Sequence, residues 1–147
     1  MKALKYKRLQ FPRWLMRDQD FKRIINAKTI DARLSLDIVQ MAPETRSTGA
    51  KRILAKWLYQ TAYFSRFALN VSVQISEHIE HLHADTKEVI LKKGATANAM
   101  YLIFKGRVGI YNDRAHPKPV VILGETVQFG AEALERNAKR AAWVIAE

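Results

Sequence analysis

The first half of the chain places apolar residues at three- to four-residue steps, a spacing typical of amphipathic helices. One such segment follows Pro12, a residue that fits the first turn of a helix, and a second covers Thr29 to Met41. Two further segments begin near residues 48 and 70. The residues predicted to share one face of each helix are Trp14, Leu15, Phe21, Ile24 and Ile25; Ile30, Leu34, Ile38 and Met41; Ile53, Leu54, Trp57, Leu58 and Thr61; and Val71, Ile75, Ile79 and Leu82.

Polar residues at the start of the last two segments can cap the helices. Ser47 or Thr48 can accept a hydrogen bond from the first turn of the third helix, which we expect to run to about Phe64. Asn70 or Ser72 can do the same for the fourth helix.

The spacing changes from Lys87 onward, where short β-branched and aromatic runs alternate with turn residues. This pattern predicts a small antiparallel barrel or jelly roll. The predicted strands are Glu88 to Leu91, Tyr101 to Phe104, Val108 to Tyr111 and Val120 to Leu123, with turns at Gly94, Gly106, Asn112-Asp113 and Pro117 to Pro119. Ala42 to Gly49, rich in turn residues, is the predicted linker between a helical extension and the main domain.

Composition indicates one globular domain with an extension. The chain has 147 residues, of which 48% are apolar and 27% charged. It contains no cysteine, which fits a reducing compartment, and no apolar run approaches the ~20 residues that a membrane span needs. We therefore expect a soluble, cytoplasmic protein.

The formal net charge of +11 leans toward the first half of the chain. Basic residues are dense from Lys2 to Arg33 and recur at Arg46, Lys51, Arg52 and Lys56. A solvated basic face is the favoured interpretation. Contact of this half with nucleic acid or an anionic membrane surface stays open as an alternative.

An anion site is predicted in outline between Gln128 and Val144. Gly130 opens a short helix-prone segment, and Arg140 stands just before the apolar run Ala141 to Ala146. A helix start offers unpaired N–H groups, and a guanidinium can pair with a phosphate in a forked contact. Alternatively, Arg140 lies at a solvated strand edge and Phe129 belongs to the core.

These residues resemble the cyclic nucleotide-binding domain family over about residues 50 to 147. Gly94 to Tyr111 resembles its strand-turn-strand core, and Phe129-Gly130 with Arg140-Ala141-Ala142 resembles its phosphate-binding cassette. The resemblance implies an α+β fold with helices first and an antiparallel jelly-roll barrel second. It also implies a regulatory signalling module for cyclic AMP or cyclic GMP, whose helical lead-in moves when the ligand binds.

The implied ligand-binding residues follow from the cassette. The amides after Gly130 and the guanidinium of Arg140 would hold the cyclic phosphate, Ala141 would line the base side, and Glu132 would take the ribose. The full predicted set is Phe129, Gly130, Ala131, Glu132, Ala133, Leu134, Arg140, Ala141 and Ala142.

The cassette departs from the family pattern at several positions. The family glutamate that accepts the ribose 2′-hydroxyl is replaced by Ala131, and Glu132 is rotated from that position by roughly 100° on a helix. Losing such a hydrogen bond costs about 1.5 to 3 kcal/mol, roughly ten- to a hundredfold in affinity. Lys139 stands in place of the usual proline, and Thr126 in place of a usual glycine.

The end of the sequence matters for the same expectation. The family continues with a further strand and a lid helix, whereas this chain stops at Glu147. We therefore expect a fragment whose barrel is incomplete at the C-terminal end, and binding that is weak or absent.

The predicted domains are a basic helical extension, residues 1–46, and a cyclic nucleotide-binding-like domain, residues 47–147, with its helical lead-in at 47–84 and barrel at 85–147. Two alternatives to nucleotide binding are kept. The barrel can serve without ligand as an interaction or assembly element that meets a protein partner through the extension, or the basic N-terminal half can bind nucleic acid.

Neither catalysis nor a metal cofactor is predicted. Ser35, Ser65, Ser72 and Ser76 lack the glycine-flanked turn of a catalytic serine, and Glu125 with Glu132 is too common a pair to indicate acid–base chemistry. His78, His81 and His83 lie near one another but lack further converging ligands, so a charged helix end is favoured over a metal site. No cofactor is expected beyond the cyclic nucleotide ligand.

Overall fold

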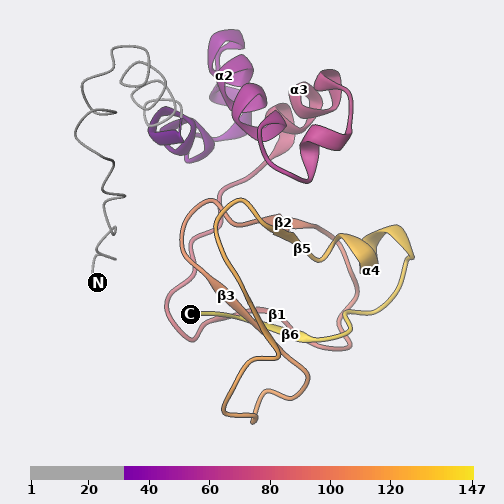
Figure 1. Ribbon diagram of the computed structural model, residues 1–147. Helices are drawn as coiled ribbons and strands as arrows, with labels where there is room; N and C mark the ends of the chain where they lie inside the picture. The colour runs from indigo at the N-terminus through magenta and orange to yellow at the C-terminus, as the bar shows by residue number, and fades with distance from the viewer. Residues whose placement is uncertain (1–31) are drawn as a thin grey trace, which may run out of the picture.

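The computed structural model describes residues 32–147, with a helical layer followed by two β-sheets (Figure 1). The predicted helix after Pro12 lies outside the described residues. Residues 32–39 are helical and agree with the second predicted helix. A 3₁₀ turn, η2 (Pro43–Thr45), then leads into α2 (Thr48–Tyr59). Within the described part, no helix is both long enough and apolar enough to cross a membrane.

Helix α2 begins as its sequence predicts. The Ser47 side chain accepts a hydrogen bond from the Ala50 amide at 3.1 Å, which confirms the N-cap. The predicted face is buried through Leu54, Trp57 and Leu58. The helix ends at Tyr59 and not near Phe64, because the chain tightens into a turn there and the Thr61 hydroxyl donates to the Leu58 carbonyl at 2.7 Å.

Helix α3 (Leu69–His78) begins earlier than predicted. Its N-cap is Ala68, which makes no side-chain cap, so the prediction of Asn70 or Ser72 as the cap is wrong. Ser72 is fully buried, and packing places it inside the helix. Leu82 lies beyond the end of the helix and is exposed, so it does not extend the predicted face.

The helices share one core cluster between η3 (Phe64–Arg66), α2 and the segment before it. Ile38 and Val39 of the helical residues 32–39 are buried with Leu54, Leu58 and Phe64. Residues on both sides of the predicted boundary after residue 46 therefore pack together, and the division into domains stays a prediction.

The second half forms two antiparallel sheets. One has the order β1 (Val89–Leu91), β6 (Trp143–Ala146), β3 (Val108–Tyr111) and β4 (Val121–Leu123); the other pairs β2 (Tyr101–Leu102) with β5 (Gln128–Phe129). The predicted α+β class and the four predicted strands are confirmed, although β2 ends two residues earlier than Phe104. The described residues form no closed barrel.

Apolar side chains fill the sheet half and join it to the helices. Leu91, Ile103, Val108, Phe129 and Val144 form the core of the sheets. The Phe104 ring stacks on Trp57 of α2, with the ring centroids 3.9 Å apart. This stack fixes the helical layer against the loop after β2.

Candidate functional site

Arg140 is the buried cation of the sheet half, with 4% of its surface exposed. Its Nη1 donates to the Gly130 carbonyl at 2.6 Å, and its Nη2 donates to the Ala99 carbonyl at 2.5 Å. The Arg140 main chain also pairs with the turn after β1: its amide donates to Ala95 and its carbonyl accepts from Gly94, both at 2.8 Å. The arginine therefore ties the cassette turn to residues 94–99.

The turn at Gly130 needs glycine for two reasons. Its φ of 81° lies in the left-handed region, at the N-cap of the short helix α4 (Ala131–Glu135). A Cβ at this position would lie 2.8 Å from Nη1 of Arg140. The glycine that the sequence pattern singles out is thus the position against which the guanidinium packs.

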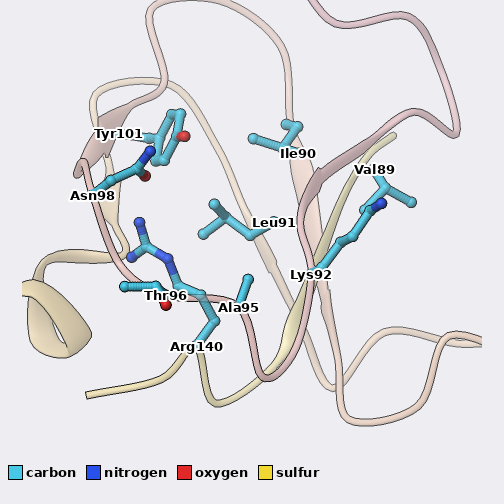
Figure 2. A pocket seen from close by; sticks show the side chains of 9 residues that line it. All are labelled: Val89, Ile90, Leu91, Lys92, Ala95, Thr96, Asn98, Tyr101 and Arg140. Carbon is cyan, nitrogen blue, oxygen red and sulfur yellow. The ribbon is translucent and has the colours of Figure 1, made fainter.

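A cavity of about 290 Å³ opens beside Arg140. Figure 2 shows the guanidinium on the same side of this cavity as the Tyr101 ring and the Asn98 amide. Tyr101 is held in place by stacking on Phe129, with the centroids 5.2 Å apart. The lining residues are Val89, Ile90, Leu91, Lys92, Ala95, Thr96, Asn98, Tyr101 and Arg140.

Positive charge dominates this lining. Arg140 and Lys92 are cations, and none of the lining residues is acidic. A third cation lies beside the cavity, because Lys139 Nζ donates to the Thr96 hydroxyl at 2.8 Å. The arrangement favours an anionic ligand with an apolar or aromatic part, which Ile90, Leu91 and Tyr101 can contact.

The other predicted ligand residues are not among those that line this cavity. Phe129 is buried in the core behind Tyr101, and Ala131 is buried at the start of α4. Glu132 points outward: Arg136 Nη1 lies 3.0 Å from its Oε1, and the Glu132 side chain is 76% exposed. Of the nine predicted residues, Arg140 alone lines the cavity; Gly130 contacts Arg140, whereas Ala133, Leu134, Ala141 and Ala142 are not among the lining residues.

Sequence reasoning missed most of the wall of the cavity. Thr96, Asn98 and Tyr101 follow the Gly94 turn, which the pattern identified only as a connection between strands. The available signal was the run of small and polar residues between that glycine and the aromatic strand. The hydrogen bond from Arg140 to the Ala99 carbonyl brings this run beside the guanidinium.

The histidines do not gather into a second site. His78, His81 and His83 are all exposed, and residues 32–147 contain no group of three or more potential metal ligands. His83 Nε2 lies 3.4 Å from the Asp85 carboxylate at the surface.

Comparisons with solved structures identify the fold. No protein-family model matches the chain, and no curated protein matches it. The cGMP-bound EAL enzyme Bd1971 is similar over a shorter stretch: it is 39% identical over 42% of this chain and 17% of that one, with a TM-score of 0.39.

Two regulatory chains match over more of the structure. cAMP-bound PfPKA-R has a TM-score of 0.59 at 19% identity, covering 67% of this chain and 34% of that one. The regulatory subunit of a cAMP-independent protein kinase A from Trypanosoma cruzi, bound to guanosine, has a TM-score of 0.58 at 17% identity, covering 65% and 36%. The chain thus spans about a third of these two proteins, and it has the fold of a cyclic nucleotide-binding domain.

Proposed function

We propose that the protein is a non-enzymatic regulatory module that binds a cyclic nucleotide with low affinity through Arg140. The observation that supports this most directly is a buried guanidinium on the wall of a cavity that no acidic residue lines. The neighbours in fold are regulatory chains of kinases, which supports a regulatory role over a catalytic one.

Arg140 retains capacity to bind a phosphate. A guanidinium carries five N–H donors in a fixed fork, and two of those on Arg140 are used by the carbonyls of Gly130 and Ala99. Those two bonds hold the plane of the guanidinium in place, so a phosphate meets donors that are already ordered. Charge-assisted bonds of this kind are about twice as strong as neutral ones.

Low affinity follows from the rest of the wall. The described site has one buried cation and a cavity near the lower end of the roughly 300 to 1,000 Å³ usual for ligand pockets. Glu132, the residue predicted to hold the ribose, is paired with Arg136 at the surface. The sugar therefore gains no charged acceptor.

The fold alone leaves the chemistry of the ligand open, because one neighbour holds cAMP and another holds guanosine. Arg140 distinguishes these possibilities, since a neutral nucleoside offers no anion to a guanidinium. A phosphorylated ligand is therefore expected in preference to a nucleoside.

Isothermal titration with cyclic AMP, cyclic GMP and guanosine tests this function. We expect the wild-type protein to bind at least one cyclic nucleotide with a Kd of roughly micromolar to millimolar and guanosine at least tenfold more weakly. Arg140→Lys, which keeps the charge but loses the fork, and Arg140→Ala should both remove the binding.

Arg136→Ala is the matched control, because Arg136 lies on the neighbouring helix turn with its side chain 73% exposed. Its affinity should equal that of the wild type, and circular dichroism should show that all variants are folded. A wild-type protein that ignores both cyclic nucleotides at millimolar concentration removes the proposal.

The two alternative functions depend largely on residues 1–31, which lie outside the described part. Contact with a protein partner through the basic extension and contact with nucleic acid both stay predictions.

A further inference from the structure

The residues that line the cavity suit the phosphate of a nucleotide better than its sugar. Its charged lining residues are Lys92 and Arg140, both cations, and its neutral polar ones are Thr96, Asn98 and Tyr101. Figure 2 shows the Lys92 amine beside Val89, across from the guanidinium, so a phosphate at Arg140 meets one buried positive charge. A sugar hydroxyl, which donates best to a carboxylate, finds none among the lining residues.

The carboxylates on the nearest elements are engaged elsewhere. Glu132 of α4 pairs with Arg136 at 3.0 Å, and Glu135 accepts from the Tyr63 hydroxyl at 3.4 Å. Glu88, which precedes β1, accepts from the Asp85 amide at 2.8 Å. Each of the three therefore has a partner outside the cavity.

The neutral acceptors are poor substitutes. The Thr96 hydroxyl oxygen already accepts a hydrogen bond from Lys139 Nζ, and Asn98 is exposed, so water competes for its amide oxygen. At a solvent-exposed position, a neutral hydrogen bond to the ligand replaces one to water, so the net gain in binding free energy is small. The 2′-hydroxyl of a bound nucleotide should therefore contribute little to affinity.

From this, and resting on the proposed function, we propose that the cavity recognises the phosphate of a cyclic nucleotide and is indifferent to its 2′-hydroxyl. Its ligand class is then a cyclic nucleotide in which ribose and 2′-deoxyribose are equivalent. Selectivity between ligands comes from the anion at Arg140 and from the base against the apolar wall.

The test is a titration of the full chain with cyclic AMP and with its 2′-deoxy analogue under the same conditions. We expect the two dissociation constants to agree within about threefold, well under the ten- to hundredfold that a charged acceptor for the hydroxyl would produce. A 2′-deoxy analogue that binds more than threefold more weakly overturns the inference while the proposed function stands. If neither compound binds, the proposed function fails and this inference fails with it.

A pair of matched variants tests whether a carboxylate of α4 holds the 2′-hydroxyl. Glu132→Gln should leave the ratio of the two dissociation constants unchanged, as should Glu135→Gln on the same helix, because neither carboxylate lines the cavity. A loss of affinity for cyclic AMP alone in Glu132→Gln would show that this carboxylate holds the 2′-hydroxyl, and would contradict the inference.

Discussion

At the scale of single residues, Thr126 has a backbone conformation that is unfavourable for its side chain. Its φ is 67°, a left-handed conformation that costs a residue with a Cβ roughly 1 to 2 kcal/mol and suits a β-branched residue least. Its amide donates to the Ile103 carbonyl at 2.8 Å, which holds the turn in place. We predict that Thr126→Gly raises the free energy of unfolding by about 0.5 to 1 kcal/mol, after the entropy that glycine adds to the unfolded chain.

Denaturant unfolding measures this change, and Thr86→Gly is the control. Thr86 is exposed and has a negative φ, so its replacement relieves no backbone strain and should be neutral or destabilising. Equal effects of the two substitutions would show that the turn at Thr126 is not strained.

Residues also show how far a site can be predicted from sequence. Arg140 and Gly130 could be found because a guanidinium and a left-handed glycine are constrained by chemistry and by backbone geometry. The direction of Glu132 depends on a pairing with Arg136 four residues later, which competes with any ligand. The wall made by Thr96, Asn98 and Tyr101 depends on tertiary packing, which leaves no local pattern.

At the scale of elements, Arg46 joins the C-terminal ends of two helices. Its guanidinium donates to the carbonyls of Ile38, Val39 and Met41 and to that of Ser76 in α3, at 2.8 to 3.2 Å. Burial lowers the pKa of Arg46, while the nearby carboxylate of Glu44 raises it. The side chain occupies the place where carbonyls at helix ends lack partners.

We predict that Arg46→Met lowers the free energy of unfolding by about 2 to 4 kcal/mol, because it leaves several buried carbonyls unpaired. Arg52→Met, on the exposed side of α2, should change it by less than about 0.5 kcal/mol. Thermal and denaturant unfolding provide the measurement. If Arg46→Met lowers the free energy of unfolding no more than Arg52→Met does, water must donate to the carbonyls in place of the guanidinium.

Elements with a strong local signal were predictable, and the others were not. Helix α2 carries its cap and its apolar face in sequence, as does β3 with its run from Val108 to Tyr111. Helix α3 begins at Leu69 without a side-chain cap, so its start could not be found from a capping rule. The two-residue strand β5 exists because β2 pairs with it, a contact between distant parts of the chain.

At the scale of the whole molecule, the response to acid depends on a carboxylate that ties three segments together. Glu147 accepts from Lys87 Nζ at 2.8 Å and from the Tyr111 hydroxyl at 2.5 Å. These hydrogen bonds lower the pKa of Glu147 below its ordinary value of 4.5. Because the pKa is lower in the folded state than in the unfolded state, the contribution is complete above pH 4.5 and is lost as pH falls through the folded-state pKa.

We therefore predict that the free energy of unfolding falls on acidification below pH 4.5 and that Glu147→Gln makes this fall less steep. Urea unfolding at a series of pH values gives the slope. Glu80→Gln, which alters an exposed carboxylate, should leave the slope as it is in the wild type. A slope unaffected by Glu147→Gln would show that other groups govern acid unfolding.

The stack of Trp57 on Phe104 gives the protein an intrinsic optical reporter. Trp57 is 8% exposed and joins the helical layer to the loop after β2, so its indole emits from an apolar environment as long as the two halves remain together. Separation of the halves would hydrate the indole and move its fluorescence to longer wavelength. The chain also contains Trp14 and Trp143, so a titration followed by the emission spectrum of a variant with phenylalanine at both positions shows whether occupation of the cavity displaces the helices.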